Sequence, residues 1–284
     1  MRIEEKTLKH WIENFYGYGS WDARIWFVGY EEGGGDLPEE VAEKFNYFDN
    51  KHAQGTSTLC DIRDLYRHVS FQSEGPRADL FTNLYEHRFD RNALLHGAWK
   101  NLIAFVHGYR GKKLPDLLVY QKKSFLSQAN NEALIQLYPL PSTHNHAWYY
   151  AWLDMPQFGF LKSRALYEEH VYQSRMNVIL KSISIHKPEV VLMYGMSNIN
   201  VLKESVQWFF PAAKFKMVQA TDLPASLQRS NAGMKGRSTP QHHRADFNGT
   251  TLLITTQVPT LRHNRIETGF DWLEFGKMAK AMLK

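Results

Sequence analysis

Four short runs of apolar residues predict buried β-strands, and most of them stop at a residue that bends or breaks a strand. The runs occupy residues 25–28, 133–138, 188–194 and 251–256. Gly29 follows the first run, Pro139 the second and Gly195 the third. Uninterrupted apolar runs of this length are typical of parallel strands that are covered on both faces. The pattern therefore predicts a central sheet whose strands end in sharp turns.

Residues with helical spacing separate these runs. An N-terminal helix is expected where Leu8, Trp11, Ile12 and Phe15 recur, and a second helix carries the stripe 172–183. Further helices are expected at about 198–208 and 270–283. Strands that alternate with helices indicate a parallel sheet with helices on both faces. We therefore predict an α/β fold, a three-layer α/β/α sandwich around a central four-stranded, mostly parallel sheet.

No segment of the chain has the composition of a linker, so residues 1–284 are predicted to form a single domain. Residues 36–124 follow the first strand, are rich in aromatic residues and histidine, and show no clean repeat. We interpret this stretch as a helical and irregular insertion.

Composition excludes several classes of protein. Hydrophobic residues make up 43% of the chain, which indicates a folded protein. Cys60 is the single cysteine, so an intrachain disulfide and a four-cysteine zinc or iron–sulfur site are excluded, and a reducing, cytoplasmic setting is expected. The first residues lack the apolar core of a signal peptide, and no apolar run reaches the length of a membrane span.

Charge is distributed unevenly. The net charge is +5, and residues 223–245 contain no acidic residue but include Arg237, Arg244, His242 and His243. Their glycine, serine, asparagine and proline content predicts a loop. A basic loop before a strand is well placed to contact phosphates, although such segments are often only solvated surface.

Candidate chemistry begins with Glu31 and Glu32, which follow the first strand and precede three glycines. Ligands of open α/β sheets bind outside the carboxyl ends of the strands, which is where these carboxylates are expected. The alternative is a surface loop whose acidic residues cap the next helix. His144 and His146 have metal-ligand spacing, but no acidic partner follows them, so neither a metal site nor a cofactor is predicted.

The ends of the four strands, in this order, resemble the uracil-DNA glycosylase superfamily. The matching segments are 27–33, 137–141, 188–195 and 257–263, and the resemblance covers roughly residues 20–40 and 130–284. It implies a carboxylate that positions water, a base-recognition site at the second strand end, and a last loop that binds phosphate. It further implies a side chain in that loop that fills the gap left by a flipped base.

Carried over to this chain, the resemblance assigns Glu31 as the carboxylate that handles water, with Glu32 as a second candidate. Val258 stands where the family has a histidine that stabilises the departing base, and His263 is the substitute. The resemblance also implies base recognition at Gln136 and Tyr138, phosphate contacts at Pro259 and Thr260, and Leu261 or Arg262 in the gap. The strand-end positions of Tyr30 and Tyr194 suggest stacking, and the charge of Arg237 and Arg244 suggests phosphate contacts. The iron–sulfur branch of the family is excluded by the single cysteine.

The resulting hypothesis is a monofunctional DNA glycosylase that flips out a damaged or modified base and hydrolyses its glycosidic bond. A modified cytosine of viral DNA is one possible substrate, and either repair or antiviral defence is a possible role. The protein is expected to be a monomer with DNA as its partner and no membrane association. One alternative is a catalytically silent nucleic-acid-binding relative, suggested by Val258. Another is a hydrolase of small nucleotides that uses Glu31 and Glu32 with a divalent metal.

Overall fold

Short strands that are far apart in the sequence pair into one sheet in the computed structural model. The model describes residues 3–34, 38–71, 80–127, 132–142, 148–153, 155–218, 227, 240–259 and 270–281. Within these ranges the strands are β1 (Phe15–Tyr18), β2 (Ile25–Gly29), β3 (Thr58–Cys60), β4 (Glu132–Gln136), β5 (Val190–Tyr194), β6 (Lys216–Met217), β7 (His242–Phe247) and β8 (Thr250–Thr255). Their order across the sheet is β3-β1-β4-β2-β5-β8-β7-β6.

The α/β class predicted from the sequence is confirmed, but the described residues form a sheet of eight strands rather than four. The four predicted strands are β4, β2, β5 and β8, which are parallel neighbours at its centre. The additional strands were missed because they are short or polar. Phe15 was predicted to belong to the N-terminal helix, yet it begins β1, and α1 ends before it (Glu5–Asn14).

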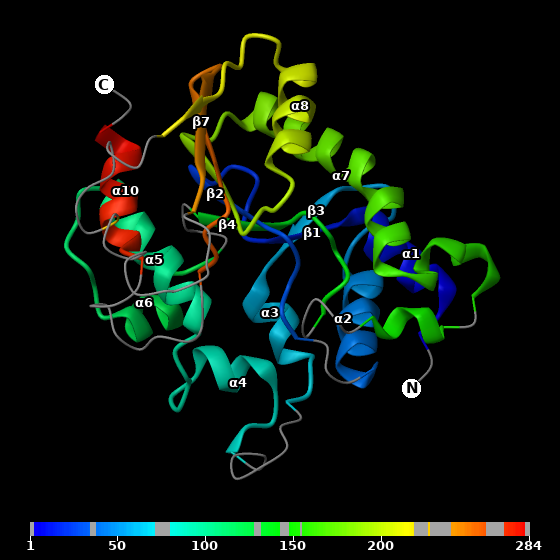
Figure 1. Cartoon of the computed structure of the whole chain (residues 1–284). Helices are drawn as coiled ribbons and strands as arrows, with labels where there is room; N and C mark the ends of the chain where they lie inside the picture. Colours follow the sequence, from blue (N-terminus) through cyan, green and yellow to red (C-terminus); the bar gives the residue numbers. More distant parts are fainter. Residues whose placement is uncertain are drawn as a thin grey trace, which may run out of the picture.

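Helices cover both faces of the sheet because successive side chains of a strand point to opposite sides. Phe27 of β2 contacts Phe105 of α5 (Gly97–Tyr109), whereas its neighbour Trp26 contacts His186 at the end of α7 (Arg164–His186). Helix α10 (Trp272–Ala281) packs on α5, and α8 (Ile199–Phe209) packs beside α7. Figure 1 shows α5, α6 and α10 on one side of the strands and α7 and α8 on the other.

The described part of segment 36–124 contains helices and one strand. Its helices are α2 (Pro38–Lys51), α3 (Ile62–Arg67), α4 (Leu84–Phe89), α5 and α6 (Leu117–Lys123). Strand β3 pairs with β1 and so extends the sheet. Trp11 of α1 packs against Phe45 and Phe48 of α2, which ties this segment to the N-terminus. Among the described helices, none is long and apolar enough to span a membrane.

Arg175 fastens α7 to the strand ends. Its side chain is 1% exposed, and its guanidinium donates to the backbone carbonyls of Phe15 (2.7 Å), Gln136 (2.6 Å) and Leu137 (3.1 Å). The same group lies 3.6 Å from the centre of the Tyr16 ring. One side chain of α7 therefore holds β1 and the carboxyl end of β4.

Two glycines let α5 and α10 cross closely. A Cβ atom at Gly108 would lie 1.9 Å from the carbonyl oxygen of Leu273, and one at Gly276 would lie 2.1 Å from that of Phe105. Contacts this short are impossible, so only glycine fits at either position.

We expect Gly276→Ala to destabilise the protein by about 2 kcal/mol, because the added methyl group forces the two helices apart. Alanine otherwise stabilises a helix interior by roughly 0.5–1 kcal/mol relative to glycine, so a loss isolates the crossing contact. Urea denaturation measures the effect. Gly159→Ala is the matched control, because a Cβ at Gly159 meets no atom within 4 Å. Equal stability of the two variants would refute the interpretation.

Candidate functional site

The carboxyl ends of the four central strands lie level at one edge of the sheet. Gly29 of β2 aligns with Gln136 of β4, and the pairing of β2 with β5 and of β5 with β8 continues the row. The segments that follow β2 and β4 remain paired, since the N–H of Tyr138 donates to the carbonyl of Tyr30 at 2.8 Å. This edge therefore brings together the four residues predicted to contact a base, which are Tyr30, Gln136, Tyr138 and Tyr194.

Glu31 leaves the end of β2 toward the first turn of α7 and pairs there with Arg164. Nη1 of Arg164 donates to Oε2 of Glu31 at 2.6 Å, and Nη2 donates to Oγ of Ser142 at 2.6 Å. Only 9% of the Glu31 side chain is exposed. Burial raises the pKa of Glu31, the Arg164 guanidinium opposes this rise, and the Glu168 carboxylate adds to it. One guanidinium thus orients Glu31 and favours its ionised form.

Glu32 occupies a different environment, although it is the next residue. Its Oε2 accepts a hydrogen bond from the Tyr18 hydroxyl at 2.8 Å, and its Oε1 accepts from the Tyr66 hydroxyl (2.9 Å) and Lys44 Nζ (3.2 Å). The Lys44 side chain is only 1% exposed. Both oxygens of Glu32 therefore accept hydrogen bonds, and Oε1 also forms a buried ion pair with Lys44. Oε1 of Glu31, by contrast, accepts no hydrogen bond from the residues that the structure describes.

Aromatic side chains lie beside Glu31. The ring centres of Tyr30 and Tyr138 are 4.6 Å apart. Burial, together with a hydrogen bond to Glu168, raises the pKa of Tyr30, so its hydroxyl stays protonated as a donor. A cavity of about 400 Å³ opens next to these rings, between the strand ends and the starts of α7 and α8. This volume falls within the range of small-molecule sites.

Gln136 and Tyr194 lie on the adjoining strand ends. Gln136 is 2% exposed, and its Oε1 has no hydrogen-bond partner in the described part of the chain. A Cβ atom at Gly29 would lie 2.6 Å from the Tyr194 hydroxyl oxygen, so that hydroxyl lies over the backbone of Gly29. A buried amide oxygen without a donor is costly, and a bound group that offers an N–H would satisfy it.

Some predicted site residues fall outside the described ranges. These are Arg237, Thr260, Leu261, Arg262 and His263. Pro259, the last described residue of that loop, is buried, and Val258 is 48% exposed beside Gly195. His144 and His146 also lie outside, and no group of three metal-binding side chains occurs among the described residues.

Arg244 was predicted to lie in a phosphate-binding loop, and the loop is wrong. Arg244 lies within β7, which pairs antiparallel with β8, and its guanidinium pairs with Asp246 at 2.8 and 2.9 Å. Its side chain is 12% exposed. His242 and His243 are also buried in this strand. The polar sequence of β7 suggested a loop, but pairing with β8 makes it a strand.

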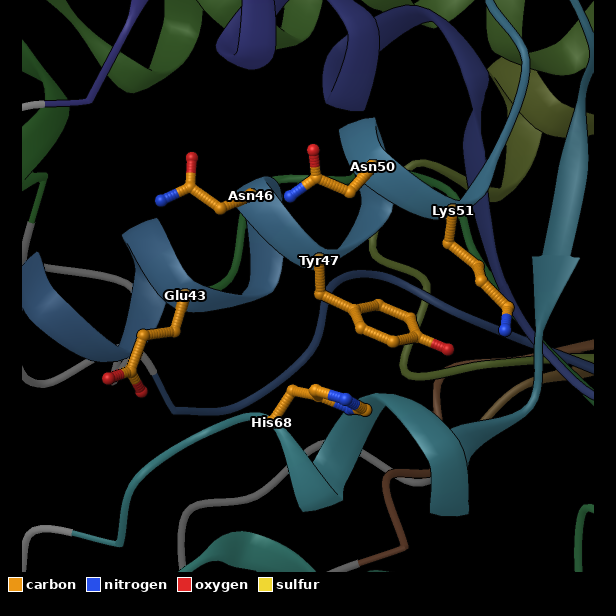
Figure 2. Close-up of a pocket in the computed structure, with 6 residues that line it drawn as sticks. All are labelled: Glu43, Asn46, Tyr47, Asn50, Lys51 and His68. Carbon is orange, nitrogen blue, oxygen red and sulfur yellow. The ribbon is translucent and has the colours of Figure 1, made fainter.

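A second hollow, of about 400 Å³, lies between α2 and α3 (Figure 2). Tyr47 and His68 face each other across it, whereas Asn46 and Asn50 point away from them. Two of its polar groups are already engaged by Asp64: the Tyr47 hydroxyl donates to the Asp64 carboxylate at 2.5 Å, and His68 Nδ1 forms a hydrogen bond with the Asp64 backbone carbonyl at 2.8 Å. None of the predicted site residues lines this groove.

Sequence reasoning missed Arg164 and Glu168. The predicted helix was read from a stripe that begins at residue 172, whereas α7 begins at Arg164, eight residues earlier. Ser163 was an available signal, since its hydroxyl accepts from the N–H of Leu166 and caps the helix.

We expect Glu31→Gln to cost less stability at pH 7 than Glu32→Gln. The folded-state pKa of Glu31 is raised, so above that pKa its ionised form is less favourable to folding than a neutral side chain, and this gain offsets the lost pairing with Arg164 in Glu31→Gln. Glu32→Gln breaks a buried ion pair and should cost about 3 kcal/mol. Thermal denaturation measures both, and Glu13→Gln on the exposed face of α1 is the control. Unchanged stability of Glu32→Gln would contradict this interpretation.

We expect Arg164→Met to raise the pKa of Glu31 by roughly one unit or more, because the opposing guanidinium is removed. Carbon-13 NMR titration of the glutamate carboxyls measures this pKa, and Glu31→Gln identifies the signal. Arg24→Met removes an arginine that pairs with Glu189 instead, and it should leave the Glu31 titration unchanged. A Glu31 pKa insensitive to Arg164 would disprove the pairing.

Comparisons of the chain with protein-family models, with curated proteins and with solved structures find no match. The resemblance to the uracil-DNA glycosylase superfamily therefore rests on the sequence motifs and stays a prediction.

Proposed function

We propose that the protein is a DNA glycosylase that hydrolyses the N-glycosidic bond of a damaged or modified base. The observation that carries the proposal is the position of Glu31, which lies where the carboxyl ends of the four central strands are aligned. There Arg164 orients it next to Tyr30, which together with Tyr138 lines a base-sized cavity. A base inside a duplex cannot be reached, so the target nucleotide is flipped into this cavity.

Each described side chain has a role in the proposed reaction. Glu31 orients the attacking water and stabilises the oxocarbenium-like transition state by its negative charge. Arg164 is a positioning residue that favours the ionised form of Glu31 against the effect of burial. Gln136 offers a buried amide oxygen to an N–H group on the base edge. Tyr30 and Tyr138 form the aromatic wall against which the base packs.

Other parts of the proposal derive from the resemblance alone. Pro259 and Thr260 would bind phosphate, Leu261 or Arg262 would fill the gap in the duplex, and His263 would stabilise the departing base. Arg237 would add a phosphate contact, whereas Arg244 is assigned no DNA contact because it pairs with Asp246. A cytoplasmic monomer acting in repair or antiviral defence remains part of the proposal. The cytoplasmic setting alone has support, from the single cysteine, Cys60, a buried thiol whose pKa is raised by burial.

The test is base release from DNA in the presence of a chelator. Oligonucleotides that carry uracil, hypoxanthine, oxidised bases or modified cytosines are incubated with the protein, and abasic sites are revealed by alkaline cleavage. We expect the wild type to cleave at least one of them. Glu31→Gln should be slower by roughly 100-fold or more, because carboxylate assistance is typically worth ~10²–10⁴-fold.

Glu13→Gln is the control for this assay, since that carboxylate is exposed on α1 far along the chain from the site. DNA binding that weakens with salt, without any abasic product, would replace the proposal with the catalytically silent relative suggested by Val258. Activity abolished by the chelator would favour the metal-dependent nucleotide hydrolase instead.

A further inference from the structure

The cavity beside Tyr30 has an unusual lining for a protein proposed to bind DNA. Among the described residues that line it, Glu168 and Glu169 are the only charged ones. Glu169 forms no ion pair with a described residue. Glu168 lies 3.8 Å from Arg164, but this guanidinium also serves Glu31 at 2.6 Å. The local charge is therefore negative, and a phosphate group would be repelled from this cavity.

Among the described lining residues, only those at the N-terminus of α8 lie in a positive field that opposes the two carboxylates. Ser197 and Asn198 border the cavity, and Asn198 is the N-cap of α8. A helix N-terminus carries the equivalent of roughly half a positive charge, which is too small to offset two carboxylates. The cavity therefore favours a positively charged group.

Aromatic rings supply the second half of the lining. Tyr30, Tyr138 and Tyr172 border the same space as the two glutamates. Rings of tyrosine attract cations through their negative faces, and carboxylates accept charge-assisted hydrogen bonds from ammonium groups. Glu168 shares Arg164 with Glu31, and Glu169 pairs with no described cation. Tyrosines combined with these carboxylates form a lining suited to a protonated amine.

We infer that this cavity binds an amine-bearing base, in which a pyrimidine carries a substituent that ends in a protonated amino group. Release of such a base rests on the proposed function, whereas binding of the amine in the cavity does not. Tyr30 directly precedes Glu31, and Arg164 links Glu31 to Glu168, so a substituent in the cavity would leave the glycosidic bond near the candidate carboxylate.

The test compares two oligonucleotides that differ in one group of the substituent, 5-aminomethylcytosine and 5-hydroxymethylcytosine. The wild type should release the amine-bearing base with a kcat/KM roughly tenfold higher or more, because a charge-assisted bond replaces a neutral one. The preference should shrink as salt is raised. Glu169→Gln and Glu168→Gln should each lower the ratio of the two kcat/KM values toward one, whereas Glu13→Gln should keep it. Glu169 is exposed, so its variant is expected to fold normally.

The outcomes separate the inference from the proposed function. Release of the hydroxymethyl base at an equal or higher rate would overturn the inference and leave the glycosylase proposal standing. Absence of abasic sites on every oligonucleotide would overturn the glycosylase proposal, and calorimetry with the two free nucleosides then decides the inference. Tighter binding of the aminomethyl nucleoside that Glu169→Gln abolishes supports it, and equal binding or no binding refutes it.

Discussion

The arrangement of the site depends on one buried cation, Arg175. No carboxylate from the described residues pairs with it, so its charge is balanced by three backbone carbonyls and the face of Tyr16. Burial lowers the pKa of this arginine, yet a guanidinium remains charged in proteins. Truncating it would remove the guanidinium donors from the carbonyls of Phe15, Gln136 and Leu137, and a buried carbonyl that loses its donor is costly. The strand ends and α7 are therefore held as one unit.

This anchor also sets the geometry of the candidate carboxylate. Arg164 lies eleven residues before Arg175 on the same helix, about 16 Å along its axis. Because a helix is rigid over this length, fixing Arg175 to the sheet fixes where Arg164 meets Glu31. A flexible arginine on a loop would not hold a mostly buried carboxylate in the same way. Positioning by the scaffold, rather than by local loop structure, is what a catalytic group requires.

The central strands and their ends were predictable from sequence because apolar runs depend on local composition. Tyr30, Gln136, Tyr138 and Tyr194 follow from that reading, since parallel strands end at the same edge. The choice between Glu31 and Glu32 was not predictable, because adjacent carboxylates differ only in distant partners. Tyr66 and Lys44 reach Glu32 from α3 and α2, and Arg164 reaches Glu31 from α7.

The strands β1 and β7 and the burial of Arg175 also could not be predicted from the sequence. Strand β7 has a polar composition, and β1 contains a glycine and only four residues, so neither presents an apolar run. Arg175 lies within a helical stripe of apolar residues, and nothing local indicates that it is buried. The partners of β1 and Arg175 lie far along the chain, whereas β7 forms a hairpin with the neighbouring β8. In each case the pairing rather than the composition decides the structure.

The strand order affects how the protein folds during its synthesis on the ribosome. Strand β4 lies between β1 and β2, and β5 flanks β2 on its other side, so β2 gains both neighbours only after residue 194 has been made. Until then the apolar residues of β2, including Trp26 and Phe27, have no completed sheet to enter. More than half of the chain must therefore leave the ribosomal tunnel before the core can close. A polypeptide truncated before that point would expose the apolar strand β2 to chaperones and proteases.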